Sequence, residues 1–171
     1  MRKKLLAALP WGIAALALAA AAVFAVLWQQ GEARERERDE VRAAGERFVT
    51  ALTNFSHETI VEDADRIRSF AVGRFEEEAG VFFGARAIEA IQDAEATSRG
   101  NIEALFVESI ADDEASIFAV VSESITNSQA TEPQTEIVRL HVEMVNVDDT
   151  WKVEMVEILQ SPGSQPVLPG V

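Results

Sequence analysis

The chain has 171 residues, which suits one domain of ordinary size, and it contains neither cysteine nor tyrosine. The absence of cysteine excludes disulfides, thiolate catalysis and cysteine-based metal sites. The 15 basic and 29 acidic residues give a net charge of −14. This charge argues against a nucleic-acid-binding protein, because such proteins neutralise phosphates with Lys and Arg.

An uncharged apolar stretch over residues 5–28 follows a basic start of the chain. About 20 apolar residues, each rising 1.5 Å, span a hydrocarbon core of about 30 Å. Trp11 and Trp28 lie 17 residues apart and can mark the two membrane interfaces. We therefore expect residues 1–28 to form a cytoplasmic basic tip and an uncleaved single-pass anchor in the cell membrane, with the rest of the chain outside. A cleaved signal peptide is the alternative, but its apolar region is usually about 7–15 residues long.

The part after Trp28 holds all 29 acidic residues and 12 of the 15 basic ones, so its net charge is −17. Such a charge argues against a further role on anionic lipid surfaces. Residues 29–47 interleave both signs and predict a solvated helical stalk with opposite charges four residues apart. An apolar stripe at helical spacing begins inside this segment, and it predicts packing on the domain that follows, with a short coiled-coil dimer as the alternative. The stripe consists of Val41, Ala44, Phe48, Leu52 and Phe55.

Two amphipathic helical segments come next. The first covers residues Ile60 to Ala71. Ser56 or Thr59 is expected to cap its start, and Thr59 with Glu62 matches a capping box. The second covers Arg74 to Thr97, where Gly84 bends or divides the helix.

Beyond Gly100 the apolar period changes from helical to two, which is typical of strands. Short acidic turns join the first strand to the second and the third to the fourth, and a longer polar loop over residues 127–134 lies between the second and the third. We therefore expect adjacent strands to pair antiparallel. The prolines and glycines of residues 161–171 predict a disordered tail. The expected strands are Ile102–Ile110, Ala115–Ile125, Ile137–Val147 and Trp151–Leu159.

Helices grouped before an antiparallel sheet indicate an α+β fold. We expect residues 48–160 to form one domain, a cystatin/NTF2-like cone in which the helices pack on a four-stranded antiparallel sheet.

Three features together resemble the Mce-associated membrane proteins of actinobacteria. The first is the basic tip, single span and charged stalk. The second is the stretch ALTNFSHETIVEDADRIRSFAVGRFEEE, in which Asp63, Ala64 and Asp65 form an acidic step and Phe70 and Phe75 are the aromatic residues that follow. The third is the closing strand pair DDTWKVEMVEIL.

This resemblance covers about residues 1–160 and implies a non-catalytic accessory protein that scaffolds or stabilises an Mce-type lipid or sterol import complex. The implied partners are protein subunits of that transporter and the bilayer itself, and self-association stays open. Two alternatives remain. One is a VirB8-like assembly factor of a secretion or conjugation machine, which shares the plan of an anchor and a cone. The other is an NTF2-like domain that binds a small apolar ligand.

No catalytic motif occurs in the sequence, and we expect no enzyme activity, cofactor or metal. An isomerase-type cone would need converging acid, base and oxyanion donors, and the absence of tyrosine removes the phenol donor. His57 lies at a polar helix entry, and His141 shares a strand face with Arg139 and Glu143, which a solvated sheet face explains.

Aromatic residues of the predicted domain form a candidate apolar pocket, with ordinary core packing as the alternative. These residues are Phe75, Phe82, Phe83, Phe106, Phe118 and Trp151.

Overall fold

The computed structural model describes residue 32 and residues 34–129 and 132–159. The chain divides into two compact units after Asp39.

The predicted membrane anchor, residues 1–28 with Trp11 and Trp28, lies outside the described residues, and so does the predicted tail, residues 161–171. Within the described part of the chain, no helix combines the length and the apolar character needed to cross a membrane.

The described residues of the first unit, 32 and 34–39, are helical and mostly exposed. Nη2 of Arg36 lies 3.3 Å from Oε2 of Glu32. This contact confirms the opposite-charge pair expected at a spacing of four residues, and it contributes little at the surface.

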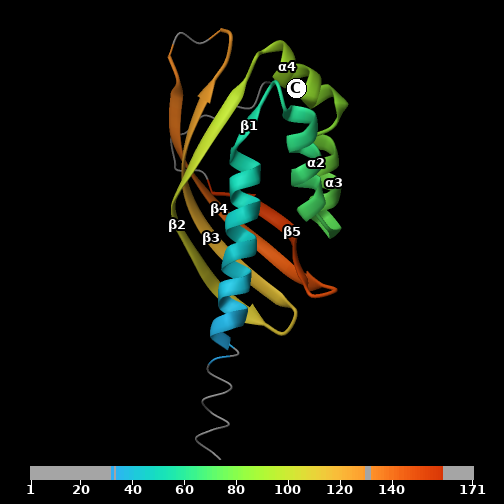
Figure 1. The fold of residues 1–171 in the computed structure, drawn as a ribbon, viewed down its shortest axis with the longest axis vertical. Helices are drawn as coiled ribbons and strands as arrows, with labels where there is room; N and C mark the ends of the chain where they lie inside the picture. The colour runs from blue at the N-terminus through green and yellow to red at the C-terminus, as the bar shows by residue number, and fades with distance from the viewer. Residues whose placement is uncertain (1–31, 33, 130–131, 160–171) are drawn as a thin grey trace, which may run out of the picture. The chain divides into compact units, whose positions relative to one another are not determined.

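The second unit begins with helical residues 40–53, which we call the N-terminal helix, followed by three shorter helices (Figure 1). The helical segment predicted from Arg74 to Thr97 is divided into two helices, which is one of the two outcomes expected from Gly84. They meet at Gly84, where an added Cβ would lie 2.7 Å from the carbonyl oxygen of Gly80. The second of them ends at Asp93, because Thr97 already belongs to a strand. The helices are α2 (Ile60–Phe70), α3 (Gly73–Phe82) and α4 (Ala85–Asp93).

The sheet has five strands, not the four predicted, and they follow one another in chain order. The additional strand, β1, pairs Phe55 with Ser98 and Ser56 with Thr97. Two residues are too few to show an alternating pattern, so this strand has no sequence signal. The strands are β1 (Phe55–Ser56), β2 (Thr97–Ala111), β3 (Glu114–Thr126), β4 (Gln134–Val147) and β5 (Thr150–Ile158).

All neighbouring strands pair antiparallel, as predicted. Irregularities interrupt the register of β2 with β3 after Ile102 and after Val107, and that of β4 with β5 after Glu143. Bulges of this kind bend a strand and increase its twist, and the sheet curls accordingly. Asp148 and Asp149, with φ of 50° and 60°, form the tight turn between β4 and β5.

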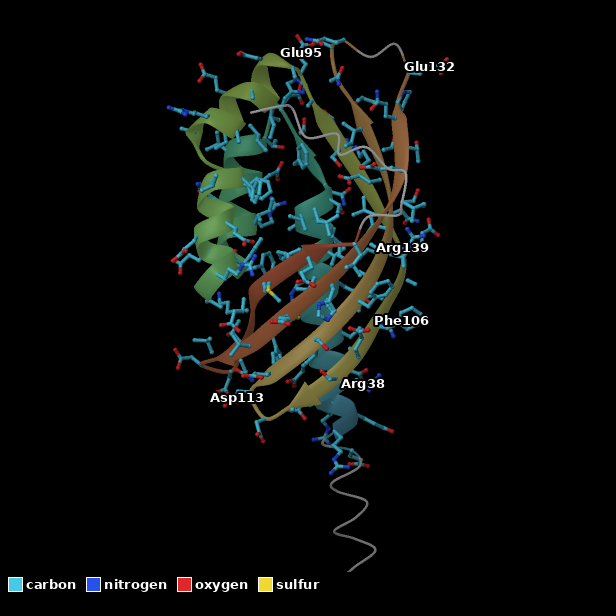
Figure 2. All side chains as sticks on the ribbon, turned by 180° about the vertical axis from the view of Figure 1, so that it is seen from behind. Arg38, Glu95, Phe106, Asp113, Glu132 and Arg139 are labelled. Atoms are coloured by element: carbon cyan, nitrogen blue, oxygen red, sulfur yellow. The ribbon has the colours of Figure 1, made fainter. Side chains whose placement is uncertain are left out.

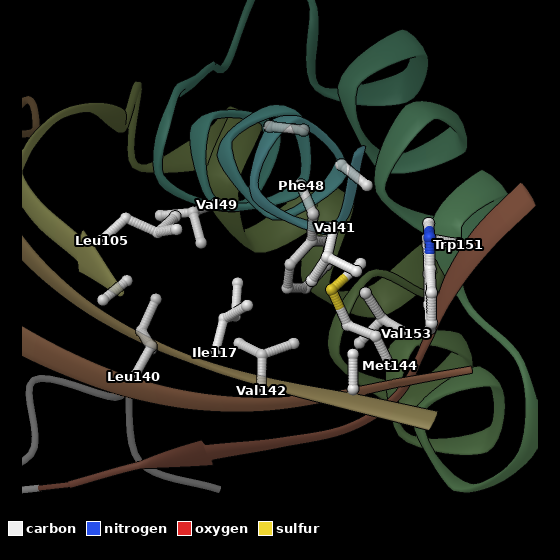
Figure 3. Close-up of a cluster of buried hydrophobic side chains, with 14 of the residues drawn as sticks. Val41, Phe48, Val49, Leu105, Ile117, Leu140, Val142, Met144, Trp151 and Val153 are labelled. Atoms are coloured by element: carbon white, nitrogen blue, oxygen red, sulfur yellow. The ribbon is translucent and has the colours of Figure 1, made fainter. Parts of the chain in front are cut away.

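The N-terminal helix packs on one face of the curled sheet, which we call the inner face (Figure 3). Val41 and Phe48 of the helix are fully buried, as is Ile117 of β3. A Cβ added at Gly45 would overlap the side chain of Ile117, so glycine permits the close approach. Phe48 also makes edge-on ring contacts with Phe70 at 5.8 Å and Phe75 at 5.4 Å between centroids. Val41, Ala44, Phe48 and Leu52 of the apolar stripe therefore pack on the domain, as expected, whereas Phe55 lies beyond the helix in a strand. Residues 40–47, assigned to the stalk from the sequence, belong to the second unit.

The start of α2 differs from the predicted capping box. Thr59 makes no capping bond to the helix backbone; its hydroxyl donates to Oδ2 of Asp63 at 2.7 Å. The same carboxylate accepts the backbone N–H of Ser56 at 3.3 Å, and Nη1 of Arg66 lies 3.2 Å from its Oδ1. Asp63 is 6% exposed, so these partners compensate its burial and join β1 to α2.

Candidate functional site: the outer face of the sheet

The six aromatic residues proposed as a pocket do not come together. Phe75 and Trp151 are buried in the core, whereas Phe82 is 55% exposed on α3. Phe106 and Phe118 lie on the outer face of the sheet, opposite the core, because their neighbours in the alternating pattern point inward. The sequence pattern contains aromatic residues of the right kind, but only the strand register assigns each one to a face. Phe83 is partly buried against the core.

The inner face of the sheet is filled by the protein itself. Val41, Ala44 and Phe48 of the N-terminal helix occupy the space against the strands, each at most 2% exposed. The small-ligand alternative needs an open apolar space inside this cone. The described residues thus place side chains where the small-ligand alternative expected a pocket.

Two depressions in the described part of the second unit are open grooves on the surface of the N-terminal helix. One has a volume of about 540 Å³ and lies between this helix and α2, with Arg47, Arg66 and Phe70 among its lining residues. The other, about 330 Å³, lies between the same helix and the part of β2 around Glu103. Neither collects the aromatic residues that the sequence suggested.

The outer face carries an apolar patch that crosses three strands. Phe106 of β2 pairs with Phe118 of β3, and the next outward residue of β3, Val120, lies diagonal to Ile137 of β4. Phe106 is 59% and Ile137 49% exposed. Figure 2 shows Phe106 on this face, with the N-terminal helix behind the sheet. We call Phe106, Phe118, Val120 and Ile137 the outer patch. Exposed apolar residues that adjoin one another, unlike scattered ones, mark interaction surfaces.

A polar group borders the outer patch. The register places Phe118 opposite His141 and His141 opposite Glu157. Nε2 of His141 lies 3.2 Å from Oε2 of Glu108, and its Nδ1 lies 3.9 Å from Oε2 of Glu157. These glutamates come from β2 and β5, on either side of the strand that carries the histidine.

The cluster around His141 differs from the one expected from the sequence. Arg139 and Glu143 share its strand face, but the carboxylates that contact the ring are Glu108 and Glu157, which the spacing along one strand could not reveal. In the described residues, no group of three or more His, Asp or Glu side chains has a geometry that could hold a metal ion. The arrangement joins three strands and gives the edge of the outer patch a polar border.

A second polar cluster, which the sequence did not predict, lies on the inner face at the end of the sheet where β1 pairs with β2. The hydroxyl of Ser98 lies 2.8 Å from the carbonyl oxygen of Thr53 and 2.5 Å from Oε1 of Glu123. Ser98 is 1% and Thr53 3% exposed. Burial raises the pKa of Glu123, the hydrogen bond with Ser98 opposes this, and the neighbouring Glu136 adds to the rise. The cluster attaches the end of the N-terminal helix to β2 and β3.

His57, the other histidine, lies between β1 and α2. Its backbone N–H donates to the carbonyl oxygen of Ala96 at 2.9 Å. Its Nδ1 is buried without a hydrogen-bond partner among the described residues. The residue therefore joins β1 to the segment before β2 through its backbone.

Solved structures of three proteins share this fold at low sequence identity. The IcmL-like type IV secretion system protein from Legionella pneumophila is 10% identical with a TM-score of 0.61, over 75% of this chain and 96% of that one. VirB8 of Agrobacterium tumefaciens is 11% identical with a TM-score of 0.60, over 76% and 96%. CagV, a VirB8 homologue from Helicobacter pylori, is 17% identical with a TM-score of 0.54, over 71% and 99%.

At these identities the likeness establishes the fold, which is VirB8/NTF2-like, and not the function. Among curated protein sequences, none matches this chain significantly. A sequence profile does match, over residues 6–160. The chain belongs to the family described as "Uncharacterized protein Rv1363c/MT1408-like".

Proposed function

We propose that this protein is a non-catalytic, membrane-anchored assembly protein whose second unit binds protein subunits of a membrane complex through the outer patch. The observation that carries the proposal is the contrast between the two faces of the sheet. The inner face is filled by the N-terminal helix, whereas the outer face exposes Phe106 and Ile137. A face that already packs on its own helix has little area for a partner, and exposed adjoining apolar residues are the usual centre of a protein interface.

Two kinds of complex fit this role. The resemblance to Mce-associated membrane proteins supports an accessory part in an Mce-type lipid or sterol importer, which we propose first. The likeness to the IcmL-like type IV secretion system protein and to CagV, a VirB8 homologue of a type IV secretion system, supports an assembly factor of a secretion machine as the second candidate. Both roles require binding to other subunits and no chemistry, in line with the absence of catalytic motifs from the sequence.

The proposed topology follows from the sequence. Residues 5–28 form the anchor, the basic residues before them stay in the cytoplasm, and the described unit lies outside the membrane. In this arrangement the anchor keeps the partner-binding unit near the membrane, where it meets membrane-bound subunits at high effective concentration.

Site-specific photo-crosslinking of the full chain in its native membrane tests the proposal. A photo-reactive phenylalanine analogue replaces Phe106 in the outer patch or Phe82 on α3, which has the same side chain and a similar exposed fraction, 55% against 59%. We expect defined adducts from position 106 and few or none from position 82. Mass spectrometry of the adducts then separates the candidates, since transporter subunits support the first and secretion-channel subunits the second.

Equal adducts at both positions, or none at position 106, would contradict the assignment of the binding surface. A companion variant, Phe106→Glu, should release the same subunits while Phe82→Glu retains them, because a buried unpaired charge at an interface is costly. Loss of the subunits from both variants would indicate that the outer patch is not the contact.

A further inference from the structure

The groove between the N-terminal helix and α2, about 540 Å³ in volume, has an apolar floor. Ala51 is buried, and Ala43 and Phe70 are partly buried. The short alanine side chains leave depth beside the N-terminal helix. The ring of Phe70 lines the groove from the side of α2 and packs edge-on against Phe48. The floor therefore offers apolar contacts and no hydrogen bonds from these side chains.

Two arginines line the same groove, Arg47 from the N-terminal helix and Arg66 from α2, and we call it the arginine groove. Within the described part of the chain, Arg47 forms neither an ion pair nor a side-chain hydrogen bond. Nη1 of Arg66 lies 3.2 Å from Oδ1 of Asp63, and the Arg66 side chain is 58% exposed. A guanidinium group carries five N–H donors, so both arginines can bind a further acceptor.

The other polar side chains of the lining do not neutralise Arg47. Oε1 of Glu46 accepts from Nε of Arg42 at 3.0 Å, and Arg42 lies outside this lining. The side-chain amide of Asn54 bonds to both the N–H and the C=O of Gly100. The arginine groove thus holds an uncompensated positive charge on a protein whose net charge is −14.

An apolar floor beside two arginines fits an apolar surface that carries carboxylates. Arginine can bind a carboxylate through two parallel N–H bonds, which suits it to such contacts at an interface. The groove is open, whereas a site for a small molecule usually encloses most of its ligand. A helix of another protein can contact both walls at once. Its apolar side chains, three and four residues apart, form one row, and Asp or Glu residues on either side of this row can reach the arginines.

We propose that the arginine groove is a docking site for an acidic amphipathic helix of a partner protein. The apolar row of that helix covers Phe70, and its carboxylates bind Arg47 and Arg66. The N-terminal helix covers the inner face of the sheet, whereas the outer patch lies on the opposite face. The two surfaces are therefore separate, and the inference does not rest on the proposed function.

Photo-crosslinking of the full chain in its native membrane, with a short diazirine side chain in place of Thr50, tests the site. Thr50 is exposed and lines both the arginine groove and the groove beside β2. Arg47 lines only the first of these grooves and Arg42 only the second, so variants of the two arginines distinguish them. We expect an adduct with another protein. Fragment mass spectrometry should place the crosslink in a segment with Asp or Glu on both sides of an apolar row.

Arg47→Gln should reduce the yield of this adduct at least about fivefold, because it removes a charge-assisted bond from the interface. Arg42→Gln, on the same helix, should change the yield by less than about twofold, as expected of an exposed ion pair. An increase in ionic strength from about 0.05 M to about 0.5 M should also lower the yield, since salt screens exposed charges. Arg47 has no partner among the described residues, so its replacement should leave thermal unfolding unchanged and separate lost binding from lost folding.

The nature of the adduct decides the inference. A lipid or a second copy of this chain as the crosslinked molecule would overturn the proposal, and so would a partner segment without acidic residues. The absence of an adduct from position 50, or equal yields from Arg47→Gln and Arg42→Gln, would also overturn it. Adducts from position 106 report on the outer patch separately, so failure of one surface is distinguishable from failure of the other.

Discussion

A short hydrogen bond joins the side chains of Ser98 and Glu123, and its geometry links the protonation of Glu123 to the hydrogen bonds of Ser98. Oγ of Ser98 lies 2.5 Å from Oε1 of Glu123 and 2.8 Å from the carbonyl oxygen of Thr53. The hydroxyl has one proton and the carbonyl can only accept. With an ionised Glu123, the single proton of Ser98 is shared between the carboxylate and the carbonyl oxygen, whereas a protonated Glu123 can itself donate to Ser98 and leave that proton to the carbonyl. Burial raises the pKa of Glu123 above its usual value, the hydrogen bond with Ser98 opposes this rise, and the cross-strand neighbour Glu136 adds to it.

This relationship predicts a pH dependence of stability. A carboxyl whose pKa is higher in the folded than in the unfolded state contributes stability that is complete below the unfolded value, about 4.3. The contribution is lost as the pH rises through the folded value. Glu123→Gln keeps a donor for Ser98 and cannot ionise. The wild type should lose this contribution as the pH rises from about 4 to about 8, and Glu123→Gln should not. The free energy of unfolding of the variant should therefore increase relative to that of the wild type over this range.

Denaturant unfolding at several pH values measures this difference, and comparison with the wild type cancels the titration of other groups. Glu123→Ala serves as the control, since it removes the bond with Ser98 and should be less stable than the glutamine variant, by about 1 kcal/mol. Parallel pH curves for the wild type and Glu123→Gln would show that the carboxyl does not titrate in this range.

Two glycines give opposite predictions for the same substitution. A Cβ at Gly100 would overlap Oγ1 and Cβ of the buried Thr53, whose hydroxyl donates to the carbonyl oxygen of Val49. Gly100→Ala should therefore destabilise the protein by about 1–3 kcal/mol, as overpacking of a core does. At Gly80 in α3 a Cβ meets nothing within 4 Å, so Gly80→Ala should stabilise by up to about 1 kcal/mol. Thermal or denaturant unfolding measures both, and a gain at Gly100 would contradict the close contact.

Removal of the Phe48 ring tests how far the N-terminal helix belongs to the core. The ring is fully buried between the sheet and the rings of Phe70 and Phe75. Phe48→Ala should lower the free energy of unfolding by about 3–5 kcal/mol. Phe82→Ala, at an exposed position, should change it by less than about 0.5 kcal/mol. A small effect at Phe48 would mean that the helix is a stalk and not part of the domain.

The membrane topology can be tested directly because the chain contains no cysteine. Lys3→Cys and Glu132→Cys each introduce a single thiol, one before the predicted anchor and one in the loop that precedes β4. A membrane-impermeant maleimide applied to intact cells should label position 132 and leave position 3 unlabelled until the cells are opened. Labelling of position 3 in intact cells, or loss of that residue from the mature chain, would contradict an anchor with a cytoplasmic N-terminus.

Long periodic segments were predictable from the sequence. The alternation in Val138, Leu140 and Val142 identifies β4 and its inward face, and the acidic turns between strands identify the antiparallel order. Helix α2 was predicted to within one residue at its end. These features depend on contacts between residues close in sequence or on a repeated pattern, and both are visible without the fold.

Short elements and cross-strand partners were not predictable. Strand β1 has two residues and exists because the chain after the N-terminal helix passes beside Ser98. The partners of His141 and of Ser98 come from other strands, so no spacing along the chain could name them. The six aromatic residues suggested one pocket, but whether an aromatic residue faces the core or solvent depends on register, and a shift of one residue reverses the face.

The sequence by itself determined the class of this protein: an apolar segment with a basic start, then helices before an antiparallel sheet, with an acidic surface and no catalytic motif. These properties follow from composition and period, which are local. Only the tertiary structure decided which face of the sheet is open. The N-terminal helix, with Gly45 against Ile117, fills the inner face and leaves Phe106 exposed on the outer one. Which face is covered depends on how closely the helix and the sheet can approach each other. Side-chain packing between segments far apart in the sequence sets this approach, and a local sequence pattern does not reveal it.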